Sequence, residues 1–93
     1  GSVSRAVNVS GRRAPTECDL RGMTTDEAIF VLDAFLDNCV LTHVNQATII
    51  HGRGTGALRA AVQKHLKELK CVKSFRLGVY GEGEDGVTIV ELK

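Results

Sequence analysis

A turn with glycine at every second position is the part of this sequence best suited to chemistry. It joins the apolar run 47–50 to the start of a helical pattern. Three glycines cost backbone entropy that a plain connection does not require. Glycine also lets an anion approach the backbone N–H groups at a helix N-terminus, where the helix dipole adds positive charge. The pattern predicts a phosphate-binding turn formed by His51, Gly52, Arg53, Gly54, Thr55 and Gly56, followed by Arg59.

A second stretch, Asp-Leu-Arg-Gly, follows a short predicted strand. Ligands of parallel α/β sheets bind outside the carboxyl ends of the strands, so we expect this stretch to lie beside the glycine turn. Three residues then become candidates for catalysis. Arg21 is a fork donor to a phosphate, Asp19 holds Arg21, activates water or binds a metal, and His51 is a candidate acid or base. Leu20 is either a core residue or an exposed apolar contact to nucleic acid.

The glycine spacing differs from two common nucleotide sites. The dinucleotide fingerprint is GxGxxG with an acid about 20 residues later, whereas this turn reads GxGxG and residues 72–80 contain no acid. The Gly-Lys-Ser/Thr ending of the nucleotide P-loop is also absent from the turn. We therefore expect the phosphates of a nucleic acid, bound by salt-dependent contacts. Most of the four aromatic residues are expected in the core, so base stacking is not the expected mode: Phe30, Phe35, Phe75 and Tyr80.

Each candidate also has a structural interpretation. Asp19 can cap a neighbouring turn, His51 can brace its loop, and the glycines can simply permit a tight connection. The acidic segment 81–86 is expected to carry solvated charge rather than a cation. Metal-dependent nucleases usually cluster carboxylates, and here Asp19 has only Glu17 on the same face of its strand. A nuclease and a binding module therefore both remain open.

The elements that position these residues alternate along the chain. Predicted strands cover residues 17–22, 45–52, 71–80 and 86–93, and predicted helices cover 24–43 and 56–70. Thr24 and Glu27 form a capping-box pattern at the first helix. The order β-α-β-α-β-β predicts an α/β fold, a single two-layer domain with a four-stranded mixed, mostly parallel sheet and a final antiparallel hairpin strand.

Length and composition fit one small domain. The chain has 93 residues, of which 43% are hydrophobic and 25% charged. Residues 1–16 are predicted to be a flexible arm, whose opening Gly-Ser is typical of an expression tag, and residues 17–93 form the domain. No apolar run reaches the roughly 20 residues of a membrane span. Three cysteines without a CxxC pair predict reduced thiols in a cytoplasmic protein and no zinc site.

The net charge of +1 hides a division between segments. Residues 24–43 carry four acids and no Lys or Arg, whereas residues 56–70 carry four Lys or Arg side chains against Glu68 alone. Such asymmetry can steer a polyanion to one side of a domain without a high overall isoelectric point.

Three segments, residues 19–39, 49–67 and 72–92, resemble the Smr (small MutS-related) domain, and the resemblance covers residues 17–93. Their motifs are the Asp-Leu-Arg-Gly after the first strand, the His-Gly-x-Gly-x-Gly turn, and the glycine-rich hairpin before Val-Thr-Ile-Val. The chain is similar to the version at the C-terminus of a bacterial MutS paralogue.

This resemblance implies a fold like the C-terminal domain of translation initiation factor three. It implies an endonuclease that nicks DNA or cleaves RNA, helped by Mg²⁺ or Mn²⁺, within a larger ATPase whose upstream domain binds ATP. It further implies roles in DNA repair, suppression of recombination, rRNA binding and quality control on stalled ribosomes. The full-length protein is expected to be a cytoplasmic homodimer away from membranes, and the isolated domain a monomer.

Carried over by position, the family motif falls on Asp19, Leu20 and Arg21 and on the turn 51–56. Some family members have histidine where this chain has Arg21. Arginine cannot act as a general base at neutral pH, so any base role passes to another residue. The alternative function is a non-catalytic module that binds nucleic acid or the ribosome.

Overall fold

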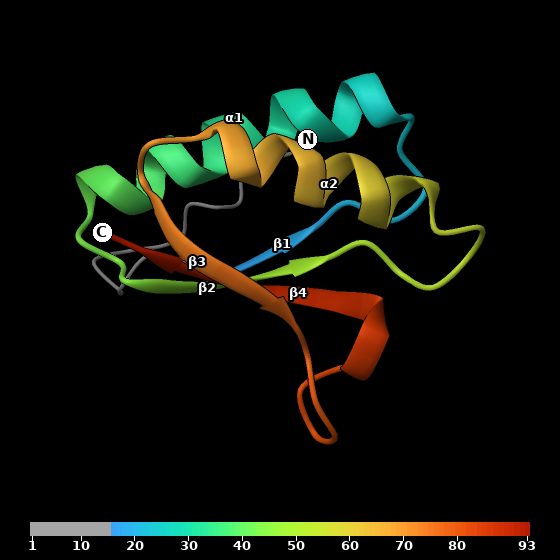
Figure 1. The fold of residues 1–93 in the computed structure, drawn as a ribbon. Coiled ribbons are helices and arrows are strands. Elements are labelled where there is room, and N and C mark those ends of the chain that lie inside the picture. The colour runs from blue at the N-terminus through green and yellow to red at the C-terminus, as the bar shows by residue number, and fades with distance from the viewer. Residues whose placement is uncertain (1–15) are drawn as a thin grey trace, which may run out of the picture.

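The computed structural model describes residues 16–93 and contains two layers. Two helices, α1 (Thr25–Leu41) and α2 (Ala57–Glu68), lie side by side on one face of a four-stranded sheet (Figure 1). The strands are β1 (Glu17–Asp19), β2 (Gln46–Ile50), β3 (Val72–Leu77) and β4 (Val87–Leu92), and a short 3-10 turn, η2 (Glu84–Gly86), precedes β4. The predicted single α/β domain and its element order are confirmed. Apart from Thr16, the predicted arm lies outside the described residues.

The strands are ordered β1-β2-β4-β3. β1 pairs with β2 in parallel, whereas β4 pairs antiparallel with both β2 and β3. The predicted mixed sheet is confirmed, and three of its strands run in one direction. Only one neighbouring pair is parallel, however, because β4 inserts between β2 and β3. The loops that follow β1, β2 and β3 therefore emerge at the same end of the sheet (Figure 1).

Helix α1 begins at the predicted capping box. The Thr24 side chain accepts a hydrogen bond from the Glu27 N–H at 3.2 Å, and the Glu27 carboxylate accepts one from the Thr24 N–H at 3.0 Å. Helical spacing then turns one apolar face of α1 toward the sheet. The buried residues of this face are Ala28, Leu32, Leu36 and Cys39.

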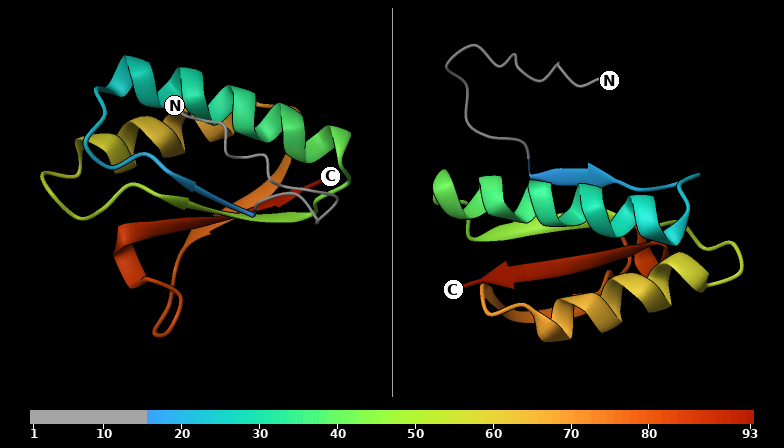
Figure 2. Two further views of the ribbon diagram at one scale, coloured as in Figure 1. Left: turned by 180° about the vertical axis from the view of Figure 1, so that it is seen from behind. Right: turned by 90° about the horizontal axis from the view of Figure 1, so that it is seen from above.

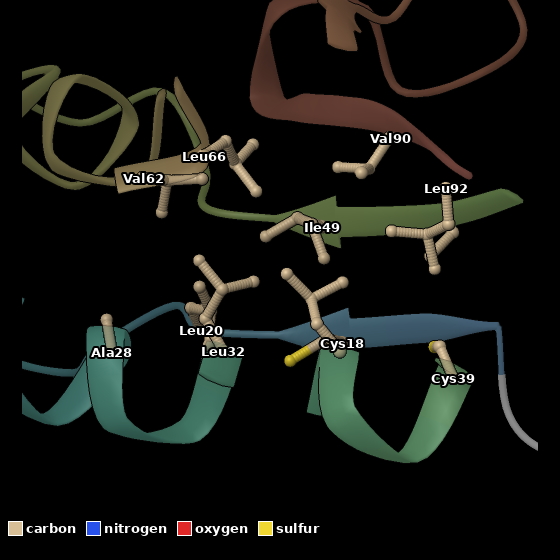
Figure 3. Close-up of a cluster of buried hydrophobic side chains, with 12 residues drawn as sticks. Cys18, Leu20, Ala28, Leu32, Cys39, Ile49, Val62, Leu66, Val90 and Leu92 are labelled. Atoms are coloured by element: carbon tan, nitrogen blue, oxygen red, sulfur yellow. The ribbon is translucent and has the colours of Figure 1, made fainter. Parts of the chain in front are cut away.

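The core lies between the helices and the sheet. Figure 3 shows side chains of α1, α2 and all but one of the strands gathered in one cluster. Burying a side chain the size of leucine stabilises a fold by about 1.5–3 kcal/mol. Burial also raises the pKa of Cys18 to about 11, so this thiol stays protonated at neutral pH. All three cysteines are free.

Two aromatic residues correct the expectation that most of them are buried. Phe30 is 76% exposed on the outer side of α1, and Tyr80 is 91% exposed in the hairpin after β3. Phe35 and Phe75 pack against the core. Tyr80 lies beyond the last paired residue of β3, so no helix covers it. No helix of the described part is long and apolar enough to cross a membrane.

Candidate functional site

A cleft of about 590 Å³ opens at the end of the sheet where these loops emerge. Residues 21–25, after β1, and residues 51–59, after β2, line it. The predicted meeting of the two loops is therefore confirmed. The lining contains three arginines and no carboxylate, so the cleft is suited to an anion. The N-terminal ends of α1 and α2 both contribute to its lining, and Figure 2 shows these two helix ends at the same end of the molecule.

Asp19 and Arg21 form a two-pronged ion pair beside the cleft. Arg21 Nε donates to Asp19 Oδ1 at 2.9 Å, and Arg21 Nη2 donates to Asp19 Oδ2 at 2.7 Å. The Arg21 backbone N–H adds a third bond to Oδ1 at 3.0 Å. The hydrogen bonds from the Arg21 side chain lower the pKa of Asp19. Asp19 therefore orients Arg21, and it is a weak base while the pair holds.

Leu20, between these two residues, is completely buried. Its side chain points into the cluster that Leu32 and Val62 help to form (Figure 3). Of the two interpretations of Leu20, the core residue is confirmed and the exposed contact to nucleic acid is wrong, because residues alternate in direction around the strand end and place Leu20 inward. Leu20 instead anchors the segment that displays Asp19 and Arg21 outward.

Arg21 crosses the glycine turn at close range. A Cβ placed on Gly52 would lie 3.3 Å from Arg21 Cγ and 3.5 Å from Arg21 Cδ. Gly52 also has φ +80°, a conformation that other residues rarely adopt. Glycine at position 52 therefore permits the Arg21 side chain to lie against the second loop.

His51 is buried, with 5% of its surface exposed. Its Nε2 lies 2.8 Å from Thr88 Oγ1, and its Nδ1 lies 2.9 Å from the carbonyl oxygen of Gly52. Gln63 Nε2 donates to the same Thr88 oxygen at 3.3 Å. A carbonyl oxygen only accepts, which assigns the proton to Nδ1 and makes Nε2 the acceptor from Thr88.

The expected role of His51 as an acid or base that meets the substrate is therefore not supported by this geometry. Both ring nitrogens are occupied, and the ring braces the start of the glycine turn against β4 and α2. Thr88 and Gln63, the partners in this network, were not among the residues predicted for the site. The sequence does contain a signal for Thr88, because this polar residue lies inside the otherwise apolar run Val87–Val90.

The N-terminus of α2 is open. Gly56 is its N-cap residue with φ 86° and has no side chain to cap the helix, and the first turn of the helix contains no acid. Thr55 Oγ1 accepts a hydrogen bond from the Ala57 N–H at 3.3 Å. Within residues 16–93, the backbone N–H groups of Gly54, Thr55 and Gly56 have no hydrogen-bond acceptor. The Arg59 guanidinium lies nearby, with Nη2 3.5 Å from a Cβ placed on Gly56. These donors form an anion-binding arrangement.

Arg53 is held by the β3–β4 hairpin. Its Nη2 lies 2.8 Å from Glu84 Oε1, and its Nε lies 2.7 Å from Asp85 Oδ1. Asp85 also lies 4.0 Å from Arg59 Nη1. Arg53 was expected to contact phosphate, but in this structure hairpin carboxylates compensate its charge. It ties the glycine turn to the hairpin, much as Asp19 holds Arg21. Arg59, whose contact with Asp85 is 4.0 Å long, is the least compensated arginine of the cleft.

The carboxylates of the acidic hairpin remain 37–53% exposed, as expected of solvated charge, and they also form ion pairs with arginines. Arg76 binds Glu82 through two nitrogens at 2.8 Å and 3.1 Å, and the Val79 N–H donates to the same carboxylate at 3.0 Å. The hydrogen bonds from Arg76 and Val79 lower the pKa of Glu82 to about 2. The hairpin carboxylates therefore act as partners for arginines of the domain.

The donor set does not fit a protein-held Mg²⁺ or Mn²⁺. No group of three His, Cys, Asp or Glu residues in the range 16–93 is arranged to hold a metal ion. Both carboxylate oxygens of Asp19 accept hydrogen bonds from Arg21. Glu17 is exposed on β1 and lies outside the cleft lining. The proposed chemistry therefore takes no step through a metal.

Comparison with known proteins agrees with this geometry. Residues 18–93 match the family model of the Smr domain. The chain is 53% identical over 89 residues to endonuclease MutS2 of Caldanaerobacter subterraneus subsp. tengcongensis, covering 96% of the chain and 11% of that protein. It is 54% identical over 91 residues to endonuclease MutS2 of Ruminiclostridium cellulolyticum, covering 98% of the chain and 11% of that protein.

A solved structure agrees as well. The crystal structure of the Smr domain of Thermus thermophilus MutS2 superimposes with a TM-score of 0.82 at 41% sequence identity, covering 84% of this chain and 98% of that one. The chain spans about a tenth of the length of the two MutS2 proteins, so it corresponds to one domain of them. On the family match and on these identities, the chain belongs to the Smr domain family.

Proposed function

We propose that this domain binds the phosphate backbone of nucleic acid in the cleft and cleaves it there as an endonuclease. One observation carries the binding: the N–H groups of Gly54, Thr55 and Gly56, which have no acceptor among residues 16–93, lie beside the guanidinium of Arg59 at a helix N-terminus whose N-cap residue is a glycine. Backbone N–H groups, a helix dipole and a guanidinium are the combination that binds phosphate in proteins. Arg21 approaches the same phosphate from the other loop.

The Asp19–Arg21 pair supplies the chemical part of the proposal. Attack by a water oxygen forms one P–O bond while the bond to the leaving nucleoside oxygen breaks. Negative charge then grows on the other phosphate oxygens, where Arg21 and the turn N–H groups stabilise it. The proton of the attacking water passes to solvent, to which this cleft is open, and the leaving oxygen takes up a proton from solvent. Asp19 keeps the Arg21 fork in a fixed orientation, which preserves the geometry of the transition state.

The names of the relatives support cleavage, since both MutS2 proteins are described as endonucleases. The bonded state of Asp19 and His51 favours a second candidate, a binding module that grips phosphates without cutting. Both nitrogens of His51 and both oxygens of Asp19 already have partners. Neither side chain is free to take a proton from an attacking water in this conformation.

Cleavage and binding assays on the same variants separate the two candidates. Supercoiled plasmid and a labelled single-stranded RNA would be incubated with the domain and with Mg²⁺, Mn²⁺ or EDTA. We expect Arg21→Ala to slow cleavage by about 10²–10³-fold, the usual cost of losing one transition-state donor. Arg21→Lys is the matched control, because it keeps the charge and loses the two-pronged geometry.

The outcomes point in different directions. Cleavage that falls in Arg21→Ala and Asp19→Ala while binding persists supports the endonuclease. Intact substrates together with a salt-dependent mobility shift that Arg59→Ala weakens would leave the binding module. Absence of any shift with the unmodified domain would remove both candidates.

A further inference from the structure

A row of exposed lysines continues from the cleft along α2. Lys64 and Lys67 lie on the solvent side of the helix, and Lys70 follows in the turn after it. The small exposed residues Ala57 and Ala60 lie between the cleft and the first of these lysines. Spacings of three and four residues place the side chains of Ala57, Ala60, Lys64 and Lys67 on one face of the helix.

These lysines differ from the arginines in their surroundings. Arg21, Arg53 and Arg76 each have a carboxylate within 2.8 Å. No ion pair of any of the three lysines occurs among the residues that the structure describes. Glu68, the acid nearest in sequence, instead lies 4.0 Å from His65 Nδ1. The three lysines therefore carry positive charge without a direct ion pair, and Asp26 and Glu68 line one surface cleft with Lys64.

The neighbouring helix limits where a polyanion can lie. Helix α1 runs beside α2 on the same face of the sheet (Figure 2). Its exposed side carries Asp26 and Asp37, and the whole helix contains no lysine or arginine. Like charge repels phosphates from α1, so the favourable surface is α2 itself. From Ala57 to Lys67 the row extends about 15 Å at 1.5 Å per residue, and Lys70 lies beyond the end of the helix.

We propose that the outer face of α2 binds the continuation of the nucleic-acid strand whose phosphate occupies the cleft. Lys64, Lys67 and Lys70 neutralise successive phosphates beyond that one, and Ala57 and Ala60 let the backbone pass close to the helix. The binding is independent of sequence, because lysine contacts to phosphate carry no base information. This inference rests on the proposed function and extends it from one phosphate to a directional path.

Salt dependence of binding tests the path. A 12-nucleotide single strand would be titrated with the domain at several salt concentrations. Each lysine that stops neutralising a phosphate of the single strand reduces the slope of log K against log salt by about 0.7. The triple variant Lys64→Gln, Lys67→Gln, Lys70→Gln should therefore flatten the slope by about 2. The matching triple arginine variant keeps the charges and should keep the slope.

A dinucleotide with one phosphodiester serves as the second probe, because it reaches only the cleft. In NMR titrations it should shift the amides of residues 53–59 equally in the unmodified domain and in the triple glutamine variant. Thermal melting of both variants checks that the fold is intact.

The outcomes separate this inference from the function beneath it. An unchanged slope in the triple glutamine variant, with Arg59→Ala still weakening both probes, overturns the lysine path and keeps the cleft. An equal loss of dinucleotide and 12-mer binding in the triple variant also overturns it, because the lysines would then act on the cleft itself. No binding of either probe by the unmodified domain overturns the path and the proposed function together.

Discussion

The two helices begin at the same cleft but treat their N-termini in opposite ways. Helix α1 satisfies its first N–H groups internally, with the reciprocal capping box of Thr24 and Glu27 and a further acid, Asp26, in its first turn. Helix α2 begins at a left-handed glycine, has no side-chain cap and has no acid in its first turn. The positive ends of both helix dipoles thus lie at the same cleft, but only that of α1 has acidic side chains in its own first turn.

This difference indicates where a foreign anion belongs. A carboxylate within the helix already stabilises the positive end of α1. The end of α2 lacks that stabilisation, and the Arg59 guanidinium beside Gly56 adds further positive charge there. An unsatisfied helix terminus costs stability, so binding of a phosphate at α2 recovers what the capping box gives α1. Substitutions at either helix end, and in the residues that support them, test this contrast.

Removing the side-chain network that supports the N-terminus of α2 should change stability the most. Thr88→Val deletes the hydroxyl that joins His51 to Gln63 and leaves buried polar groups without a partner. We expect a loss of about 1–3 kcal/mol in the free energy of unfolding. Urea denaturation measures it, and Thr88→Ser, which keeps the hydroxyl, is the control. A Thr88→Val protein as stable as the original would show that the brace contributes little.

Adding an acid to the first turn of α2 should have opposite effects on stability and on nucleic-acid binding. Ala57→Asp gives α2 the first-turn acid that α1 has, which should raise the free energy of unfolding by about 0.3–1 kcal/mol. The same carboxylate repels phosphate, so nucleic-acid affinity should fall about tenfold, or roughly 1.4 kcal/mol. Fluorescence anisotropy with a labelled single strand measures the affinity. Ala57→Asn has nearly the same size without the charge, and equal losses in both variants would contradict the electrostatic explanation.

Removing the N-cap of α1 should lower stability and leave nucleic-acid binding nearly unchanged. Thr24→Ala removes the N-cap of α1 and should cost about 1 kcal/mol of stability. Nucleic-acid affinity should change little, because α1 is not the proposed phosphate site. Thermal melting and the anisotropy titration report the two quantities. A clear gain or loss of affinity would show that phosphate also uses the end of α1.

A smaller effect concerns pH and the hairpin beside the open end. The pKa of Glu82 is lowered from 4.5 to about 2 by the hydrogen bonds from Arg76 and Val79. Its contribution to stability is therefore fully present above about pH 4.5 and is lost as the pH falls toward 2. Melting temperatures between pH 2 and 5 should decline less steeply in Glu82→Gln than in the unmodified domain. Identical profiles would mean that the pair with Arg76 does not stabilise the fold.

Local sequence signals predicted much of this architecture. The capping box, the apolar periodicity of α1 and the meeting of the two loops follow from patterns within single elements. The partners of Arg53 could not be predicted in this way, because Glu84 lies 31 residues away and reaches Arg53 only through the pairing of β4 with β2. Leu20 and His51 were candidate functional residues by type, yet their burial depends on packing against α1, α2 and β4. Spacing along a chain shows which residues share a loop, but not which side of the loop faces water.

The direction of the strands has a practical consequence for handling the molecule. β1 starts and β4 finishes at the end of the sheet remote from the cleft, since β4 runs antiparallel to β2 while β1 runs parallel to it. Lys93 is bonded there through its backbone N–H to the Cys71 carbonyl at 2.9 Å. A label attached at Lys93, such as a fluorophore, a surface linker or a fused domain, therefore lies at the end of the sheet remote from the cleft. Such a tether leaves the glycine turn facing outward, so immobilised copies keep their clefts accessible.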